Sequence, residues 1–435
     1  MKKKIVYVGL SLDIIHHGHI NLIQKASNYG DLIVGLITDK AISSYKRIPL
    51  LDYNSRKKIL ENIRGVKKIV PQYEWSYHLN ILKYKPDIMV HGDDWNLSKN
   101  GRKLKKDCLN ALKKINSKLI EIPHTKNISS TSIQEKLFND NLNTNNRQSY
   151  FKRMIQSKKL CRILETHSPL SALIAEKTFI KKSNGEKVEY DGFWSSSLTD
   201  STLKGKPDIE VLDIRERLKN INDIFDVTSK PLIMDIDTGG KNEHFEINIK
   251  SLESAGISAV IMEDKKGLKK NSLFGVQVKQ EQDSIKEFSK KIKIGKNATK
   301  KNIMIISRIE SFILNKGIAD AYKRSDSYLE AGADGVMIHS KDKDPKKIFD
   351  FANKFKKKFS NVPLVVIPSS FNQVKEKQLI NYGFDIVIYA NHLLRSSYPA
   401  MKKVALEILK NGRSLESDKS LMSIKEILNL IPGTK

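Results

Sequence analysis

The sequence has few cysteines and no long apolar run. Its two cysteines, Cys108 and Cys161, stand apart, and neither belongs to a CxxC pair. This argues against a disulfide framework or a cysteine-ligated zinc site and fits a reducing compartment. The apolar run near the start is interrupted by Asp13 and the histidines after it, so it predicts a strand and not a signal peptide. No segment approaches the roughly 20 apolar residues of a membrane span, and we expect a cytoplasmic protein without a membrane partner.

Acidic residues are scarce relative to basic ones. Asp and Glu number 49 against 77 Lys and Arg, which gives a formal charge of +28. The lysines are spread over expected helix faces without interleaved aromatic residues, which favours a solvated surface and small phosphorylated substrates over nucleic acid. Nucleic-acid binding is the alternative, and it predicts a DNA or RNA affinity that falls steeply with salt.

The first 40 of the 435 residues predict a βαβ unit at the start of a two-domain chain. Residues 5–8 and 33–37 are short apolar runs typical of strands, and residues 18–29 have helical spacing. Before the helix, His16 and His19 are three apart with a glycine between them. Histidines at a helix N-terminus can grip a phosphate chain, because glycine permits close approach and the helix dipole attracts anions. A lone histidine is more often structural, but HxGH at this turn is a more specific signal.

The motifs of the first domain follow one another in a recognisable order. They are Asp13-Ile-Ile-His16-His17-Gly18-His19, Thr38-Asp39, Arg56, His91-Gly92-Asp93-Asp94-Trp95 and Ile128-Ser129-Ser130-Thr131. With them, residues 1–138 resemble the cytidylyltransferases of the nucleotidyltransferase superfamily. The resemblance implies a Rossmann-like nucleotidyltransferase domain that uses CTP, with a phosphonate or a phosphorylated alcohol as the acceptor.

The same resemblance implies roles for individual residues. His16 and His19 would stabilise the transferring phosphoryl group. The implied nucleotide-site residues are Lys46, Asp94, Trp95, Ser129, Ser130 and Thr131. His124 stands where the relatives usually have arginine, which leaves the nucleotide and acceptor preference open. A domain that binds nucleotide without catalysis is the alternative.

Residues 139–150 are polar and rich in asparagine, and they predict a linker before a second domain at 151–435. In that domain, β-type runs alternate with helical stretches, which is typical of a (β/α)8 TIM-type barrel. The expected strands lie near residues 161–166, 190–196, 232–237, 259–263, 303–308, 335–339, 364–367 and 386–389.

Polar side chains follow strand after strand in the second domain. In a barrel these strand ends converge on one mouth. Asp235, Asp237 and Glu263 could hold one hard divalent cation there, and Mg2+ is the expected ion. Arg308 and His339 are donors suited to a phosphoryl group. For each residue taken singly a structural role is also open, such as a helix cap or an Arg308–Glu310 ion pair.

The stretch from Glu263 to Ser272, EDKKGLKKNS, joins two of these features. It places carboxylates at a strand end and then a glycine-hinged basic loop, which suggests a metal site beneath a mobile lid that meets an anion. The alternative for the same residues is a solvent-exposed, lysine-rich loop without a functional role. The gate would be 267–270, between the metal ligand Glu263 and Asn271.

The second domain resembles phosphoenolpyruvate mutase, of the isocitrate lyase and phosphoenolpyruvate mutase superfamily. The supporting motifs are Asp191-Gly-Phe-Trp194-Ser-Ser196-Ser-Leu198, Gly205-Lys-Pro-Asp208, Met234-Asp235-Ile-Asp237, Glu263 to Ser272, Ser307-Arg308-Ile-Glu310 and Ile338-His339-Ser-Lys341. The resemblance implies conversion of phosphoenolpyruvate to 3-phosphonopyruvate with Mg2+. Asp208, Asn271, Arg308 and His339 would be catalytic. The implied substrate-binding residues are Trp194, Ser196, Leu198, Lys269 and Ser272.

The loop distinguishes members of the superfamily. Carbon–carbon lyases carry a cysteine there, and this chain has none. Phosphonopyruvate hydrolase is the closer alternative, but its loop typically has threonine where this chain has Asn271. Asparagine can hold a phosphoryl group without acting as a base, which favours the mutase. We therefore expect a bifunctional enzyme of phosphonate biosynthesis that assembles as a homo-oligomer, a dimer or a tetramer.

Overall fold

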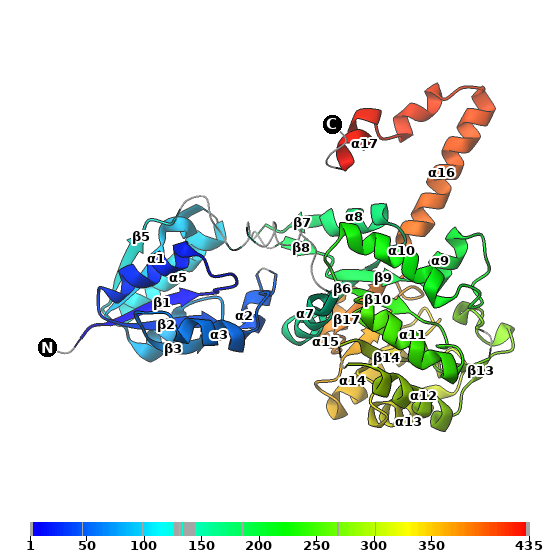
Figure 1. The fold of residues 1–435 in the computed structure, drawn as a ribbon, viewed down its shortest axis with the longest axis horizontal. Coiled ribbons are helices and arrows are strands. Elements are labelled where there is room, and N and C mark those ends of the chain that lie inside the picture. Colours follow the sequence, from blue (N-terminus) through cyan, green and yellow to red (C-terminus); the bar gives the residue numbers. More distant parts are fainter. Residues whose placement is uncertain are drawn as a thin grey trace.

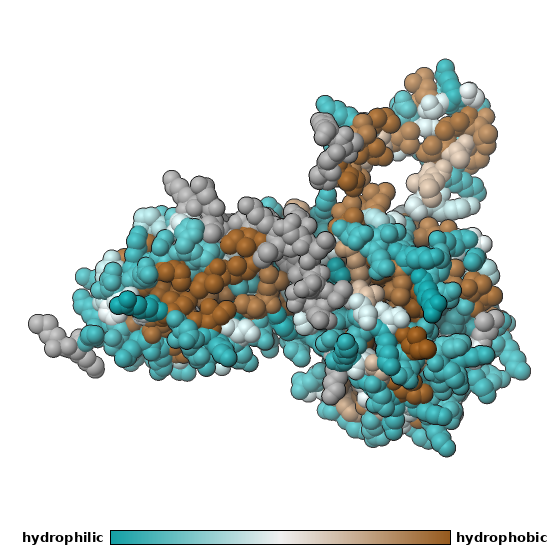
Figure 2. All heavy atoms as spheres, in the orientation of Figure 1, coloured by the Kyte–Doolittle hydropathy of each residue, from teal (hydrophilic) through white to brown (hydrophobic). Residues whose placement is uncertain are grey.

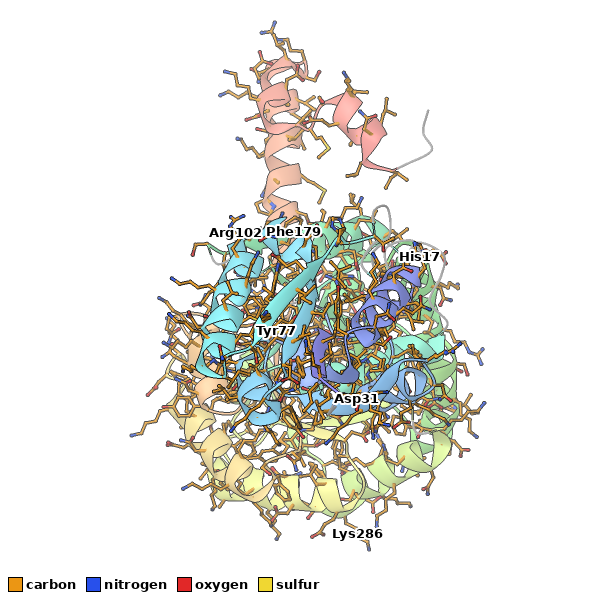
Figure 3. All side chains as sticks on the ribbon, turned by 90° about the vertical axis from the view of Figure 1, so that its left-hand side faces the viewer. His17, Asp31, Tyr77, Arg102, Phe179 and Lys286 are labelled. Carbon is orange, nitrogen blue, oxygen red and sulfur yellow. The ribbon has the colours of Figure 1, made fainter. Side chains whose placement is uncertain are left out.

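The protein folds into two bodies joined near residue 144, as Figure 1 shows for the computed structural model. Figure 3 views the chain from the side of the first body, which lies in front of the second. The structure describes residues 3–45, 47–97, 99–125, 130, 133, 144–183, 187–267, 269–300 and 302–431.

The described part of the first body is built on a parallel sheet of five strands in the order β3-β2-β1-β4-β5. Its strands are β1 (Ile5–Leu10), β2 (Asp31–Ile37), β3 (Val66–Gln72), β4 (Ile88–Gly92) and β5 (Lys118–Ile122). The helices are α1 (His17–Ser27), α2 (Asp39–Ser43), α3 (Tyr53–Glu61), α4 (His78–Tyr84) and α5 (Lys99–Lys114), with the short η1 (Asp93–Leu97). The predicted βαβ start and Rossmann-like class are confirmed.

Both faces of this sheet are covered, because its strands present apolar residues alternately to each side. Val6 and Val8 face α1 and α3 in one apolar cluster, whereas Tyr7 faces α4 and α5 in another. The strand order reverses at β1, so a crevice forms at the carboxyl ends of β1 and β4, where ligands bind in doubly wound sheets. The histidine motif follows β1, and the motif at residues 91–95 follows β4.

The second body is a closed barrel of eight parallel strands within the described residues, which confirms the predicted fold. The strands are β6 (Cys161–Glu165), β9 (Gly192–Ser195), β10 (Leu232–Asp235), β11 (Ala259–Glu263), β14 (Met304–Ile309), β15 (Gly335–Ile338), β16 (Leu364–Val366) and β17 (Ile386–Tyr389). Helices α8 (Pro169–Lys177), α9 (Ser197–Leu203), α10 (Ile214–Val227), α11 (Asn242–Ser254), α12 (Ile285–Ala298), α13 (Gly317–Glu330), α14 (Lys346–Lys358) and α15 (Glu376–Asn381) follow these strands. Short elements complete the body: β7 (Phe179–Lys181), β8 (Lys187–Glu189), β12 (Lys265–Lys266), β13 (Glu281–Gln282) and η2 (Ser272–Gln277).

Two layers of apolar packing hold the barrel, because successive strand residues point inward and outward. Ile261 and Ile306 belong to the inner cluster, whereas Val260 and Ile305 pack outward against the helices. Helix α7 (Thr144–Ser157) adds Phe151 to the inner cluster. Residues 144–150, for which the sequence predicts a linker, form the first turns of this helix. Helix α7 therefore contributes directly to the barrel core.

The chain ends in an arm that leaves the barrel. Helix α16 (His392–Asn411) extends away from it and leads to η3 (Leu415–Ser420) and α17 (Ile424–Leu430). No residue of α16 or α17 is buried, and Figure 2 shows apolar side chains gathered along this arm. None of the described helices has the length and apolar character needed to cross a membrane.

Candidate active sites

The predicted site residues of the second domain lie at the carboxyl ends of the barrel strands, called here the barrel mouth. Asp235 ends β10, and Asp237 follows it with a left-handed backbone (φ 54°). Glu263 ends β11, and its register partner is Arg308 on β14. All four side chains are largely buried. Parallel strands thus bring residues up to 73 positions apart to one place, as expected for a barrel.

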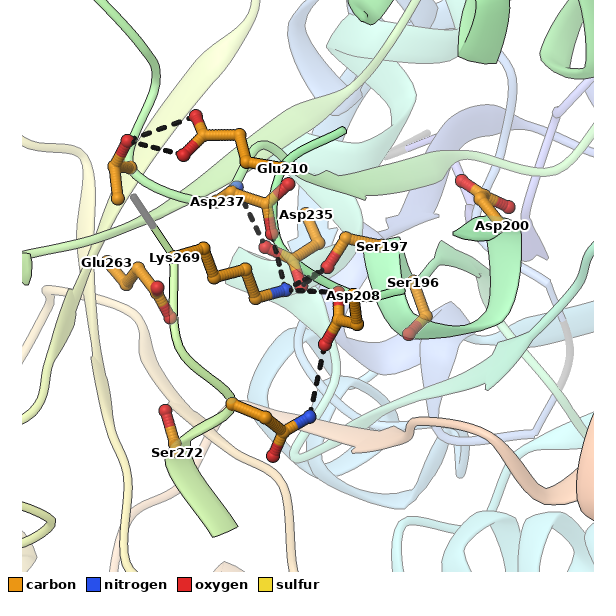
Figure 4. A network of polar contacts seen from close by, with 12 residues as sticks. Ser196, Ser197, Asp200, Asp208, Glu210, Asp235, Asp237, Glu263, Lys269 and Ser272 are labelled. Atoms are coloured by element: carbon orange, nitrogen blue, oxygen red, sulfur yellow. Dashed lines mark hydrogen bonds and ion pairs between the residues drawn. The ribbon is translucent and has the colours of Figure 1, made fainter. Parts of the chain in front are cut away.

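The ammonium group of Lys269 lies at the centre of the acidic part of the mouth (Figure 4). Its Nζ is 2.5 Å from Asp237 Oδ1 and 2.9 Å from Asp208 Oδ1, and it also donates to Ser197 Oγ. Burial disfavours the charged lysine, but Asp237 and the other carboxylates outweigh it and raise the pKa of Lys269. The loop that carries Lys269 is therefore held down over the mouth by charge pairing.

Asn271 makes a second link from the loop to the mouth. Its Nδ2 donates to Asp208 Oδ2 at 3.0 Å, while its Oδ1 accepts from the amide of Leu273 at 3.0 Å. Ser272, the next residue, donates to Glu310 Oε2 at 2.7 Å. Lys269 and Asn271 together engage both oxygens of Asp208, so that carboxylate has a fixed orientation.

The carboxylates predicted to bind a metal lie near one another but are paired with cations. The amide of Asp237 donates to Asp235 Oδ1 at 3.0 Å. Glu263 lies 3.3 Å from both Lys265 and Arg308. Among the described residues, no three His, Cys, Asp or Glu side chains are grouped closely enough to hold a metal ion. The metal assignment therefore stays a prediction.

The donor set nevertheless fits a hard cation. Both oxygens of Glu263 are buried and accept no hydrogen bond from any described residue. Carboxylate oxygens are the ligands that Mg2+ prefers. Lys269 supplies the positive charge between Asp208 and Asp237 in this conformation, which is where a cation would be favoured. Asp235, Asp237 and Glu263 are thus suitable ligands once the lysine moves aside.

Burial sets the protonation of these carboxyl groups. It raises the pKa of Glu263 to about 7, and Arg308 and Lys265 offset only part of that effect. It also raises the pKa of Asp237, against the opposing pull of Lys269. For Asp235 the nearby cations, Lys269 foremost, outweigh burial and lower the pKa. The barrel mouth thus contains carboxyl groups whose pKa values are shifted in different directions by their neighbours.

Arg308 and His339 form the cationic side of the mouth. Arg308 Nη2 lies 3.1 Å from His339 Nδ1 and donates to Ser272 Oγ at 2.8 Å. Arg308 Nε donates to Glu310 Oε1 at 2.5 Å, so the structural ion pair considered from the sequence is present. Burial, followed by Arg308, lowers the pKa of His339. A neutral His339 can then donate or accept a hydrogen bond next to a fixed guanidinium group.

The remaining predicted substrate residues lie on β9 and at the start of α9. Trp194 is 1% exposed and packs in the inner cluster of the barrel. Ser196 is the N-cap of α9, and its Oγ accepts from Thr199 at 3.4 Å. Leu198 is half-buried in the first turn of that helix. Their contacts with substrate stay predictions.

Sequence reasoning missed three polar residues of the mouth. Ser197 Oγ donates to Asp235 Oδ2 at 3.0 Å. Arg217, on α10, is 4% exposed, and its Nε donates to Asp200 at 2.8 Å while its Nη1 donates to the carbonyl of Asp235. Glu210 accepts from Thr238 at 2.8 Å, and burial raises its pKa to about 7. Ser197 lies within the motif at residues 191–198, but no spacing pattern in the sequence points to Arg217 or Glu210.

In the first domain, the histidine motif forms the N-terminus of α1. The amide of His16 donates to His19 Nδ1 at 3.4 Å, and the two ring centroids are 3.9 Å apart. A Cβ on Gly18 would come within 2.9 Å of His16 Nδ1, so a side chain there would displace the imidazole. Burial lowers the pKa of His16. The structure thus brings the two predicted catalytic histidines together.

The other predicted nucleotide residues surround the same edge of the sheet. Ser130 donates to the carbonyl of Ile14 at 3.0 Å, next to the histidine motif. Trp95 is 4% exposed and stacks on His91, with 3.9 Å between ring centroids. Asp94 follows β4, and its side chain is 58% exposed. Lys46, Ser129 and Thr131 lie outside the described residues.

Residues 151–409 match the model of the family described as phosphoenolpyruvate phosphomutase. The chain belongs to the phosphoenolpyruvate phosphomutase family. Residues 7–136 match the model described as cytidylyltransferase-like. This confirms the predicted enzyme class and the fusion to a nucleotidyltransferase-like domain.

Relatives of this phosphoenolpyruvate phosphomutase family member support both halves. A phosphoenolpyruvate phosphomutase from Tetrahymena pyriformis is 32% identical, over 64% of this chain and 89% of its own. A crystal structure of phosphonopyruvate hydrolase with oxalate and Mg2+ has a TM-score of 0.57 and 32% identity, over 66% of this chain and 95% of its own. A glycerol-3-phosphate cytidylyltransferase from Bacillus subtilis is 33% identical, over 31% of this chain and 97% of its own. Identity alone therefore does not separate mutase from hydrolase.

Proposed function

We propose that the barrel converts phosphoenolpyruvate to 3-phosphonopyruvate. The first domain would transfer a cytidylyl group from CTP to a phosphonate or a phosphorylated alcohol. The observation that carries the barrel assignment is the closed loop, whose Asn271 amide donates to Asp208 at 3.0 Å. This contact supports the proposal because it puts a neutral donor beside an acid at the mouth, where a phosphoryl group can be held and water kept out.

The reaction breaks the bond between phosphorus and the enol oxygen and forms one between phosphorus and carbon 3. The electron pair of the broken bond passes to the pyruvate enolate, whose carbon 3 then attacks phosphorus. Arg308, His339 and Asn271 would hold the phosphoryl oxygens while this exchange takes place, since such a loose group needs positioning and charge neutralisation. Asp208 would either accept the phosphoryl group or orient it.

A divalent cation fits the acidic side of the mouth. Asp235, Asp237 and Glu263 would hold Mg2+, and the ion when bound stabilises negative charge that develops on the enolate. The half-buried Leu198 and the hydroxyl of Ser196 would contact the carboxylate end of the substrate. Lys269 would leave the acidic side and turn to the ligand.

The mutase is favoured over the hydrolase by the chemistry of the loop. A hydrolase must admit water and remove its proton, whereas the side-chain amide of Asn271 takes up no proton. Asn271 also donates to one oxygen of Asp208, which favours the charged carboxylate and makes it a weaker base for water. Phosphonopyruvate hydrolysis is the second candidate, favoured by the equal identity to a hydrolase of known structure.

Phosphorus NMR tests the assignment. With Mg2+ and phosphonopyruvate, the protein is expected to produce phosphoenolpyruvate, because the isomerisation approaches its equilibrium from either side and can be started from the phosphonate. Inorganic phosphate as the only product would instead mean the hydrolase. No turnover of either kind would refute both candidates.

For the first domain, the paired His16 and His19 support nucleotidyl transfer. Two imidazoles at a helix N-terminus suit the charge that builds up on the α-phosphoryl group. Pyrophosphate release from CTP should be measured with glycerol 3-phosphate and with two-carbon phosphonates as acceptors. Measurable CTP binding without pyrophosphate release for any acceptor would favour a nucleotide-binding role without catalysis.

The C-terminal arm supports assembly into a homo-oligomer. Helix α16 is 20 residues long and amphipathic, and its apolar side chains are uncovered in the single chain. Leu409 is 80% exposed and Tyr398 is 63% exposed. Leu170 and Ile174 are likewise half-exposed on α8 of the barrel. A second copy of the chain would offer a matching apolar surface. The arm of each copy would cover the exposed apolar residues of the other copy.

A further inference from the structure

The described residues 43–45 and 47–50 join the first domain to helix α7 and the barrel. Ser43 Oγ donates to the carbonyl of Ser157 at 2.6 Å. Arg47 Nε donates to Glu189 Oε1 at 3.0 Å. Ile48, which is 1% exposed, packs into the inner barrel cluster with Phe151 of α7. This segment therefore belongs to the first domain by its position in the sequence, but its contacts are with the second domain. Figure 1 shows α2 close to α7.

Arg153 of α7 forms hydrogen bonds with the end of that segment. Its Nη1 donates to the carbonyl of Leu50 at 2.5 Å, and its Nη2 donates to the carbonyl of Pro49. A planar guanidinium group with two parallel donors suits two adjacent carbonyls, and no other side chain offers that fork. One residue of the barrel domain thus fixes the backbone orientation at Pro49 and Leu50.

The backbone that Arg153 fixes leads to the histidine motif. The amide of Leu50 donates to Asp13 Oδ1 at 2.7 Å. Asp13 is 3% exposed and lies three residues before His16. The guanidinium group, the Leu50 peptide and the Asp13 carboxylate therefore form one chain of hydrogen bonds from α7 to the turn that precedes α1.

A second connection runs through Asp39. Its Oδ2 lies 3.9 Å from Arg153 Nε, and its Oδ1 lies 2.6 Å from Nη2 of the fully buried Arg56. Arg56 in turn donates to the carbonyls of Ser11 and of Ile37. Both connections end on the turn between β1 and α1, so a shift of Arg153 would be transmitted there twice.

We propose that Arg153 is a positioning residue for nucleotidyl transfer, so that the barrel domain completes the site of the first domain. This inference rests on the proposed cytidylyl transfer. Histidines that act on the transition state must be held to within a fraction of an ångström, and hydrogen bonds behind them supply that precision. The hydrogen bonds and the ion pair of Arg153 go to Pro49, Leu50 and Asp39 and not to the histidine motif, so its effect is on the placement of His16 and His19.

The test uses the full-length protein with Arg153→Ala and Arg153→Lys. Arg153→Ala is expected to lower kcat for pyrophosphate release from CTP about tenfold or more, with KM for CTP changed less. Millimolar guanidinium ion should restore part of that loss, since Arg153 is 19% exposed and the ion can bridge the two carbonyls. Arg153→Lys should be nearly as impaired as Arg153→Ala, because one ammonium group cannot serve both carbonyls in the same geometry.

The barrel reaction of the same chains is the internal standard, and it should stay within twofold of the wild type. Glu189→Gln is the matched control: it weakens the Arg47 contact at the same domain boundary but leaves the path through Leu50 to Asp13 intact. A Glu189→Gln variant as impaired in pyrophosphate release as Arg153→Ala would refute a specific role for Arg153. Arg153→Ala that leaves release unchanged would also refute it.

The pair Asp13 and Arg153 offers a further check on the path. If Arg153 acts in part through Asp13, the loss caused by Arg153→Ala should be smaller in the Asp13→Ala background than in the wild type, with the remainder carried by the connection through Asp39. If the fold-reduction in pyrophosphate release of the double variant equals the product of the two single-variant reductions, Arg153 and Asp13 act independently and the path through Asp13 is refuted. Wild-type protein that releases no pyrophosphate with any acceptor would refute the proposed cytidylyl transfer and this inference with it, whereas intact release in Arg153→Ala refutes the inference alone.

Discussion

Asn271 reaches across the barrel mouth to Asp208, with 3.0 Å between Nδ2 and Oδ2. The two residues come from different loops, and Lys269 holds the other oxygen of the same carboxylate. The loop after β11 is therefore closed in this structure by two side chains on one acid. In the proposed reaction, the substrate would enter while those contacts are open, which would link lid closure to the formation of the site.

Removal of either partner should stop barrel turnover without unfolding the barrel. Asn271→Ala and Asp208→Ala are each expected to lower kcat about a hundredfold or more, since each removes a group placed at the phosphoryl position. Thermal melting should change little, because the Asn271 contact is a single partly exposed hydrogen bond worth about 1 kcal/mol, and in Asp208→Ala the ammonium group of Lys269 keeps its ion pair with Asp237. Lys266→Ala, an exposed lysine on the same loop, is the control and should keep its activity. A large loss of melting temperature in either site variant would contradict the assignment.

Metal removal should abolish barrel turnover reversibly. Excess EDTA is expected to stop the reaction and Mg2+ to restore it, because Asp235, Asp237 and Glu263 would hold the ion that stabilises the enolate charge. Asp237→Asn should raise the Mg2+ concentration for half-maximal activity about tenfold or more, as a neutral amide is a weaker ligand than a carboxylate. Titration of activity with Mg2+ measures this. An unchanged Mg2+ requirement in Asp237→Asn would remove Asp237 from the ligand set.

The raised pKa of Glu263 predicts a pH dependence of stability. Its folded value is about 7, against an ordinary value of 4.5, so between these values the folded state holds a proton that the unfolded state has lost. Stability of the metal-free protein should therefore fall as pH rises from about 4.5 to 7 and level off above that. In Glu263→Gln this fall should be smaller, and the remainder has contributions from Glu210, whose pKa is also about 7, and from Asp264, whose pKa burial raises to about 6.

Thermal melting in EDTA across pH 4.5 to 8 measures the effect of Glu263. Glu287→Gln, at an exposed carboxylate on α12, is the control and should follow the wild type. Identical pH slopes in the wild type and Glu263→Gln would show that Glu263 ionises normally. Mg2+ should stabilise the wild type more at pH 7 than at pH 5, because a ligand must lose its proton to bind.

The histidine motif should control only the first domain. His16→Ala and His19→Ala are each expected to lower pyrophosphate release from CTP about a hundredfold or more and to leave the barrel reaction unchanged. His17→Ala is a close control, because His17 lies between them but is exposed. If His17→Ala were as slow as the other two, the effect would come from the helix start in general and not from the paired imidazoles.

The exposed arm should hold copies of the chain together. Leu409→Glu, at a position 80% exposed in the single chain, is expected to shift the protein toward monomer, because a charge is costly in an apolar interface. Light scattering coupled to size-exclusion chromatography measures this. Lys410→Glu, on the neighbouring residue, is the charge control. A monomeric wild type, or an oligomer unaffected by Leu409→Glu, would rule out the arm as the interface.

Much of the architecture was readable in the sequence. Runs of strand-forming residues marked all eight barrel strands. Most of these runs are apolar, because a strand covered on both faces buries its side chains, although β6 includes Arg162 and β9 reads Gly-Phe-Trp-Ser. The polar residues that end those runs, such as Asp235 and Glu263, then identified the mouth. The helical part of the segment at 144–150 escaped prediction, since Arg147 and Gln148 are polar residues that become buried by bonding to backbone carbonyls of other elements.

By itself, the sequence determined the two domains, the strands and the chemical groups available, because periodicity and local motifs are properties of neighbouring residues. Only the tertiary structure decided which groups meet. It placed Lys269 between Asp208 and Asp237, added Arg217 from a helix, and set Arg153 of the barrel against the backbone that leads to Asp13. These pairings join residues 17 to 104 positions apart, and the packing of whole elements, which no local pattern encodes, brings them together.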